Sequence, residues 1–336
     1  MMRNSARKRT NLRDVAAHAG VSVATVSRVL NTPQSVAPKT RARVEASIEQ
    51  LRFVPSAAAR AINRGSSGLV AALIPTLDNA IYARVVDGLE EGLAARHLAL
   101  MVAQTGDDPA IELARAKQLV ALGAEALIVV GMSHTDGLYD LLERAQIPIV
   151  AVSHYEDSGP IPTCGYDNQR AALQAADHLA ALGHRRVAVL HGPTATNDRM
   201  RRRKVALQDA STAITFDYVE VPISVEGGHT GIHRLLEQTN SPTAVLCFSD
   251  VIALGALNAL HSRGLRVPQD MSIMGMEDLP AARFMHPPLT SVTLSVGDMG
   301  LHAAAAVADW LNTGTRPASV RLHTGVIQRD TTARIL

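Results

Sequence analysis

Polar side chains able to hold a small ligand follow several apolar, strand-like segments of this chain. Ligands of open α/β sheets bind beyond the carboxyl ends of the strands, so these positions are candidates for a binding site. Arginine supplies a rigid fork of donors and aspartate two acceptor oxygens, which together suit a polyhydroxy molecule. The candidates are Asp78, Tyr82, His154, Arg201, Asp250 and Glu277, with Asn79, Tyr155, Arg199, Ser249 and Asp278 beside them. Asp250 has a second interpretation, as the N-cap of the helix that follows it.

The sequence contains no pattern typical of catalysis. Gly227 and Gly228 lack the remaining glycines of a dinucleotide-binding loop, and a phosphate-binding loop with its Lys and Ser or Thr is absent. The histidines do not recur at metal-ligand spacing, and Cys164 and Cys247 are isolated in apolar segments, as buried free thiols are. We therefore expect neither a cofactor nor a metal. A sugar-modifying enzyme is a weaker interpretation than a binding protein.

A second kind of chemistry lies in residues 10–31 (TNLRDVAAHAGVSVATVSRVLN). Apolar residues recur at helical spacing on both sides of Gly20, which allows a sharp turn, and a serine two positions later can cap a second helix. Two helices joined in this way place the second in the major groove of DNA, although an ordinary helical hairpin has the same pattern. On that helix Arg28 could bond guanine bidentately, whereas Val23 and Ala24 could contact only apolar groups such as thymine methyls.

The charge of the chain is divided unevenly. Residues 1–64 contain 12 Lys and Arg against 3 Asp and Glu, a net charge of +9, whereas the remaining residues contain 21 against 28, a net charge of −7. A basic head favours DNA as the partner, because phosphate contacts supply much of the affinity of DNA-binding proteins. A smaller basic cluster, Arg199 with residues 201–204, is better explained by a helix with one inward arginine than by a second nucleic-acid site.

Beyond residue 68 the chain alternates apolar strands with amphipathic helices, which predicts an α/β fold with parallel sheets covered by helices on both faces. The stretch is too long for one sheet and its pattern restarts after about Pro160, so we expect two similar lobes. Residues 37–51 predict a third helix of the head, and residues 56–63 could form one or two helical turns before a flexible joint. The expected domains are a helix-turn-helix head at 1–54, a hinge and linker at 55–67, and a two-lobed body at 68–336.

Composition narrows the class further. Hydrophobic residues make up 47% of the 336 residues but aromatic residues only 3%. Few aromatic residues, together with Ala-rich helices, favour an α/β protein over a β-sandwich. The basic N-terminus is not followed by the apolar run of a secretory signal, and no apolar stretch approaches the roughly 18–20 residues that span a membrane. We therefore expect a cytoplasmic protein without a membrane partner.

Residues 14–31 (DVAAHAGVSVATVSRVLN) resemble the DNA-binding signature of the LacI/GalR family of bacterial transcription regulators. The resemblance continues through a hinge-like segment at residues 53–62 (FVPSAAARAI) and through four further motifs, so that it spans about residue 10 to about residue 334. The further motifs are Asp167 with Asn168, residues 182–186 (LGHRR), residues 264–268 (GLRVP) and residues 287–290 (PPLT).

This resemblance implies a three-helix head and a type I periplasmic-binding-protein-like body in a dimeric repressor that binds double-stranded operator DNA. It also implies that residues 56–63 form a hinge helix when two copies meet in the minor groove. Ile62 would be the apolar wedge, usually Leu, that enters between base steps, with ordinary interdomain packing as the alternative. The implied DNA contacts are Thr10, Val23, Ala24, Thr25, Ser27, Arg28, Asn31, Ala58 and Ile62.

The resemblance also implies a small-molecule effector between the lobes, with Arg201 and Asp250 at positions that bond it. The chain departs from the family pattern at Ser249, His154 and the pair Ala80 and Ile81, and its histidine and arginines favour a sugar or sugar acid. The C-terminus carries no leucine heptads, so we expect a homodimer rather than a tetramer. The alternative is a solute-binding protein without a DNA function, which would need an export signal and no basic head.

Overall fold

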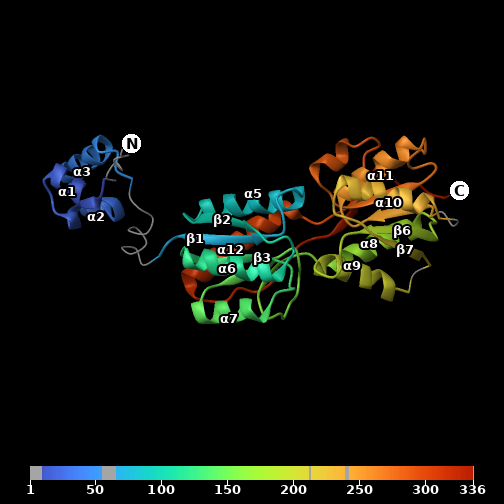
Figure 1. The fold of residues 1–336 in the computed structure, drawn as a ribbon, viewed down its shortest axis with the longest axis horizontal. Coiled ribbons are helices and arrows are strands. Elements are labelled where there is room, and N and C mark those ends of the chain that lie inside the picture. Colours follow the sequence, from blue (N-terminus) through green and yellow to red (C-terminus); the bar gives the residue numbers. More distant parts are fainter. Residues whose placement is uncertain (1–9, 55–65, 212, 239–241, 336) are drawn as a thin grey trace, which may run out of the picture. The chain divides into compact units, whose positions relative to one another are not determined.

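The computed structural model describes residues 10–54, 66–211, 213–238 and 242–335. The chain divides into two compact units, Met1–Gly68 and Leu69–Leu336 (Figure 1). The hinge helix expected within 55–67, with Ala58 and Ile62, lies almost entirely outside the described residues.

The described part of the first unit forms α1 (Leu12–Ala19), α2 (Val23–Asn31), the 3-10 helix η1 (Pro33–Ser35) and α3 (Pro38–Gln50). Asn11 begins α1 in a capping box with Asp14, and Gly20 ends it with a left-handed φ of 61°. The Ser22 hydroxyl accepts a hydrogen bond from the Thr25 N–H and begins α2, as its position in the sequence predicted. The core of this unit consists of Val15, Ala16, Ala19, Val26, Val29, Val44 and Phe53.

The first lobe of the body is built on a sheet with strand order β11-β5-β4-β3-β1-β2, whose paired strands run parallel. Its strands are β1 (Leu69–Ile74), β2 (Ala99–Gln104), β3 (Ala124–Val130), β4 (Ile149–Val152), β5 (Thr163–Gly165) and β11 (Val320–Arg321). Its helices are α5 (Ala80–Ala94), α6 (Pro109–Ala121), α7 (Asp136–Ala145) and α12 (Val296–Thr313).

The second lobe has a sheet with strand order β12-β10-β9-β8-β6-β7, in which β12 runs antiparallel to β10 and the other pairs are parallel. Its strands are β6 (Arg186–His191), β7 (Thr215–Glu220), β8 (Ala244–Cys247), β9 (Ser272–Glu277), β10 (Thr290–Thr293) and β12 (Gly325–Ile327). Its helices are α8 (Asn168–Ala181), α9 (Asp198–Asp209), α10 (Val225–Leu236), α11 (Asp250–Ser262) and the 3-10 helix η2 (Pro280–Phe284).

The chain passes between the lobes after β5, after β10 and after β11. β5 follows the restart of the pattern near Pro160, yet it pairs with β4 and extends the first sheet, and α12 and β11 also return to the first lobe. The sequence placed the lobe boundary too early, because alternation gives the order of elements but not the sheet that a strand joins. An apolar cluster continues through both lobes, from Val85 of α5 to Leu246 of β8.

Two pairs of helices approach closely through glycines, α5 with α12 and α10 with α11. A Cβ atom on Gly255 of α11 would lie 1.9 Å from the Val225 carbonyl oxygen of α10, and one on Gly228 would lie 2.0 Å from the Ile252 carbonyl oxygen. Both glycines are therefore needed for this contact between backbones. Among the described residues, no helix is long and apolar enough to cross a membrane.

Candidate functional site

The α2 helix of the first unit presents one face to its core and another to solvent. Val26 and Val29 are buried, whereas Val23 is 43% exposed and Ala24 and Arg28 are also exposed. Among the described residues, no hydrogen bond or ion pair is recorded for the Arg28 guanidinium. The three side chains predicted to reach base edges therefore share the solvent-facing side of a helix of the size that enters a major groove.

The remaining predicted contacts of this unit are partly covered and bonded within it. The Thr10 hydroxyl donates to the Leu51 carbonyl oxygen at 3.4 Å, and the Thr25 hydroxyl bonds the Ser22 hydroxyl at 2.9 Å. The Asn31 amide donates to the Ser27 carbonyl oxygen at 2.9 Å. Thr10 precedes α1, Thr25 lies in the first turn of α2 and Asn31 is the last residue of α2.

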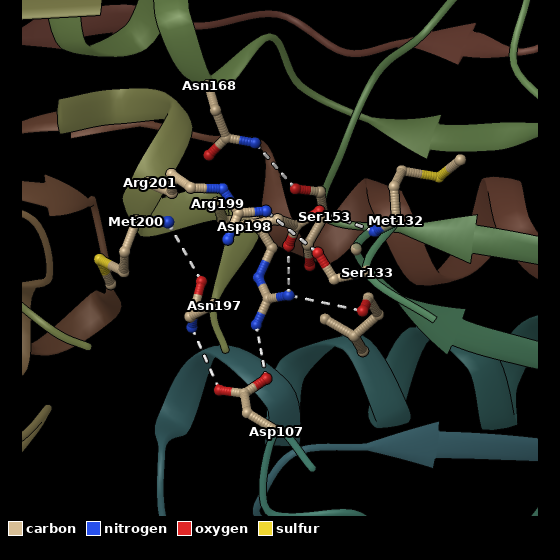
Figure 2. Close-up of polar contacts among 12 residues, drawn as sticks. Asp107, Met132, Ser133, Ser153, Asn168, Asn197, Asp198, Arg199, Met200 and Arg201 are labelled. Carbon is tan, nitrogen blue, oxygen red and sulfur yellow. Dashed lines mark hydrogen bonds and ion pairs between the residues drawn. The ribbon is translucent and has the colours of Figure 1, made fainter. Parts of the chain in front are cut away.

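A polar network joins the two lobes of the body where α9 begins (Figure 2). Arg199 of the second lobe is 5% exposed, and its Nη2 atom lies 2.9 Å from Asp107 Oδ1 and 3.3 Å from the Tyr82 hydroxyl, both in the first lobe. Its Nη1 atom lies 2.8 Å from Asp198 Oδ1. Asp198 in turn accepts the backbone N–H of Met132, in the first lobe, at 2.7 Å. Residues 197–201, at the start of α9, thus connect the second lobe to the first through charge-assisted hydrogen bonds.

Local sequence explains how this segment reaches the first lobe. The Asn197 side chain caps α9 by accepting the Met200 N–H, while its amide group donates to Asp107 Oδ2 at 3.1 Å. Gly131 follows β3 with a φ of 78°, and a Cβ atom there would lie 2.4 Å from both Arg199 Nη1 and Asp198 Oδ1. The network therefore requires a residue without a side chain at the end of β3.

A small cavity of about 20 Å³ lies between the lobes, beside Arg199. We call it the interlobe cavity; it has room for about one water molecule. Its lining residues are Asn79, Ile81, Tyr82, Ser153, Tyr166, Asn197, Arg199, Met200, Arg203, Ile223 and Glu277. Arg203 is 2% exposed and donates to Asn168 Oδ1 at 2.9 Å and to the Phe248 carbonyl oxygen at 2.6 Å. Donors and acceptors thus converge on this cavity from both lobes, as in a polar ligand site.

Burial changes the pKa of several groups at the boundary between the two lobes. Burial, with the nearby Asp250 carboxylate, raises the pKa of Glu277 to about 8, and burial raises that of Asp250 to about 6. Burial also raises the pKa of Tyr82 to about 12. The pKa of Asp198 is lowered: burial opposes this, but Arg199 and the Met132 N–H outweigh it. Asp198 is therefore ionised at neutral pH, whereas Glu277 is largely protonated.

Of the six effector residues predicted from the sequence, Tyr82 and Glu277 line the interlobe cavity and the other four do not. Asp78 is exposed, and His154 is buried with Nε2 3.8 Å from the Glu156 carboxylate. Arg201 is exposed and donates to the Thr194 carbonyl oxygen and the Ser133 hydroxyl. Asp250 is fully buried and accepts from the Ser291 hydroxyl at 2.6 Å and the Leu279 N–H at 2.8 Å.

Other residues of the network were not among those predictions. Arg199 was recognised only as a neighbour of a strand end, and the basic cluster was expected to contain one inward arginine, whereas Arg199 and Arg203 both point inward. Their spacing of four residues places both on one face of α9, and this was the available signal. Asp107 and Asp198 carried no comparable signal, because their role depends on the approach of the other lobe.

A helix-turn-helix unit followed by a two-lobed α/β body with a polar site between its lobes defines a class of bacterial DNA-binding regulator. Residues 11–56 match the model described as bacterial regulatory proteins, lacI family, and residues 176–332 match that of a periplasmic binding protein-like domain. The chain is 32% identical over 300 residues to the HTH-type transcriptional repressor PurR of Haemophilus influenzae. The aligned region covers 87% of this chain and 88% of that protein. The chain belongs to the LacI family.

Solved structures agree with this assignment. A LacI family transcriptional regulator from Silicibacter pomeroyi matches with a TM-score of 0.87 and 25% identity, covering 97% of this chain and 100% of that one. The lac repressor dimer bound to operator and the anti-inducer ONPF matches with a TM-score of 0.85 and 25% identity, with the same coverage. The predicted fold class, a helix-turn-helix head with a two-lobed parallel α/β body, is confirmed.

Proposed function

We propose that this chain represses transcription by binding an operator in double-stranded DNA through α2 of its first unit. The observation that carries the proposal is the solvent-facing set Val23, Ala24 and Arg28, on a helix whose opposite side is buried in the core. The net charge of +9 over residues 1–64 supplies the phosphate attraction that such binding needs. The relation to PurR and to an operator-bound lac repressor supports the same function.

The test is a gel-shift titration of the purified chain against promoter fragments from its own genomic neighbourhood. We expect one fragment to shift at nanomolar protein, at least about 10³-fold more tightly than unrelated DNA of the same length. Equal affinity for all fragments would mean that the basic head binds DNA without reading its sequence. No binding at low salt would contradict a DNA function.

We further propose that a small polar effector, a sugar or sugar acid, binds between the lobes and controls operator binding. Tyr82, Arg199, Arg203 and Glu277 are the residues of the interlobe cavity best able to bond it. That Asp78, His154, Arg201 and Asp250 also contact the effector stays a prediction from the sequence. The proposal assigns to the body a binding role rather than catalysis.

We also propose that the functional unit is a homodimer, in which two copies of α2 read the two halves of a near-palindromic operator. The lac repressor structure to which this chain is similar is itself a dimer on its operator. Control by the effector then requires two arrangements of the lobes for which it has different affinities. The wedge role of Ile62 and the contact of Ala58 belong to this proposal.

A further inference from the structure

The Arg199 guanidinium is shared between carboxylates that are held unequally. Asp198 has a side chain only 3% exposed and also accepts the Met132 N–H at 2.7 Å, so it is fixed in place. Asp107 is 23% exposed at its side chain, and its other recorded partner among the described residues is the Asn197 amide at 3.1 Å. Asp107 is therefore the carboxylate that can leave Arg199 for solvent.

The turn that carries Asp107 has an uncommon backbone conformation. Gly106 has a φ of 65° and Asp107 a φ of 57°, so both lie in the left-handed region, which is disfavoured for a residue with a side chain. This turn between β2 and α6 aims the Asp107 carboxylate at Arg199 across the lobe boundary (Figure 2).

The surroundings of Arg199 favour an anion as that replacement. Arg199 borders the interlobe cavity on one side and a second cavity, next to Asp107 and Ser133, on the other. Arg203 adds a second buried guanidinium to the interlobe cavity, and no carboxylate is recorded within ion-pair distance of it among the described residues. A ligand that entered here would meet two inward arginines, and Asp107 is the more exposed of the carboxylates that pair with one of them.

We propose that Arg199 is the anchor for an oxyanion of the effector and that Asp107 is its built-in competitor, displaced when the effector binds. The inference rests on the proposed interlobe effector site and adds the chemistry of the ligand, a small molecule with a carboxylate or phosphate group. Asp107 then raises the effector concentration that binding requires, because the effector must displace a carboxylate that is already bonded to Arg199.

The test is calorimetric titration of the full-length chain, without DNA and in a buffer free of other polyvalent anions, with gluconate, inorganic phosphate and glucose. The variant Asp107→Asn removes the competing charge while keeping the size of the side chain. Asp140→Asn is the matched control, since Asp140 is an exposed carboxylate on α7 of the same lobe. Arg199→Lys, alone and combined with Asp107→Asn, removes the forked geometry and keeps the charge.

We expect Asp107→Asn to bind at least one anionic probe about tenfold more tightly than the wild-type chain and Asp140→Asn do. The double variant should lose this gain, and glucose should bind alike to all variants. A gain with gluconate alone identifies a carboxylate ligand, a gain with phosphate alone a phosphorylated one, and a gain with both an oxyanion in general. No gain with either anion, an equal gain with glucose, or a gain that persists in the double variant would overturn the proposal.

Two controls separate this inference from others. Circular dichroism of each variant shows whether it is folded. If a variant has the native spectrum but no gain in anion affinity, the missing gain is a property of the site and not a result of misfolding. The titration contains no operator, so an anion gain in a chain that shifts no promoter fragment would leave the anion site standing and contradict the DNA function. Operator binding without an anion gain would support the DNA function and contradict the anion site.

Discussion

Arg199 and Arg201 lie two positions apart on α9, yet the first is buried between the lobes and the second is exposed. Each residue of an α-helix turns the side chain by about 100°, so positions i and i+2 face in nearly opposite directions, whereas i and i+4 share a face. Arg199 and Arg203 are accordingly the inward pair. At this scale a shift of two residues decides whether an arginine side chain is buried between the lobes or exposed at the surface.

On α2, the helix proposed to read the operator, the most specific expectation concerns Arg28. Arg28→Ala should weaken operator binding by about 1–3 kcal/mol and relax the preference at one base pair, because a bidentate contact to guanine would be lost. Arg28→Lys is the control, since it keeps the charge but not the fork of donors. The measurement is operator affinity over a set of single-base variants. If Arg28→Ala weakened every sequence equally, Arg28 would contact phosphate and not a base.

Glu277 should make the stability of the body depend on pH. Its pKa is raised to about 8, so the folded chain holds a proton that the unfolded chain releases above its ordinary pKa of 4.5. This contribution is complete below about pH 4.5 and is lost as the pH rises through about 8. Glu277→Gln should therefore be more stable than the wild type at pH 8, by about 1–3 kcal/mol, and similar to it at pH 5.

Urea unfolding of the two proteins at several pH values measures this difference. Arg203, Asp250 and Ser249 are the polar neighbours that act on the Glu277 carboxyl group, and all are present in both proteins. Glu226→Gln, at an exposed carboxylate of the same lobe, is the control, and its difference in stability from the wild type should not change with pH in this way. A constant difference between wild type and Glu277→Gln across the range would mean that Glu277 is ionised throughout.

Among the secondary-structure elements, the contact between α10 and α11 depends on the absence of side chains. A Cβ atom on Gly255 would lie 1.9 Å from the Val225 carbonyl oxygen and 2.8 Å from the His229 backbone nitrogen, closer than atoms can approach. The two helices would have to separate, and with them the sheet face that they cover together. The N-cap of α11, Ser249, donates its hydroxyl to Glu277, which lines the interlobe cavity.

We expect Gly255→Ala to lower the free energy of unfolding by about 3 kcal/mol or more, since neither backbone can yield without disturbing the core. Asn258→Ala is the control on the exposed side of the same helix and should change stability by no more than about 0.5 kcal/mol. Chemical unfolding of both variants provides the comparison. A Gly255→Ala chain as stable as wild type would show that α10 and α11 can move apart freely.

At the scale of the whole molecule, the proposed regulation is a coupling between two sites in separate units of the chain. Such a coupling is reciprocal: if the effector changes operator affinity by some factor, the operator must change effector affinity by the same factor. The effector must also prefer one arrangement of the lobes, since a ligand with equal affinity for both shifts nothing. The network of residues 197–201 lies where such a preference would act, because it bonds both lobes.

The assembly should be a dimer. The proposed functional unit is a homodimer, and the lac repressor structure to which this chain is similar is a dimer, so light scattering at low micromolar concentration should give twice the mass of the chain. Dilution of the same sample should lower the average mass toward that of one chain, because the dimer is held by a reversible interface. A stable tetramer of the full chain at low micromolar concentration would contradict this prediction.

The sequence by itself determined the elements and their order. Periodicity, the turn at Gly20 and the cap at Ser22 defined the first two helices of the head, and periodicity predicted the alternation of strands and helices in the body, because these signals depend on neighbours a few residues apart. The resemblance of residues 14–31 to a family signature indicated the family, and the comparisons confirmed it.

Only the tertiary structure decided which residues meet between the lobes. Asp107 and Met132 lie far along the chain from the start of α9, yet Asp107 is 2.9 Å from Arg199 and the Met132 N–H is 2.7 Å from Asp198, because the two lobes approach each other. Likewise, β11 joins the first sheet by pairing with β5, which lies far before it in the sequence. Local pattern records which face of an element is apolar, but the partner of a buried charge is set by packing, and packing is a property of the folded chain.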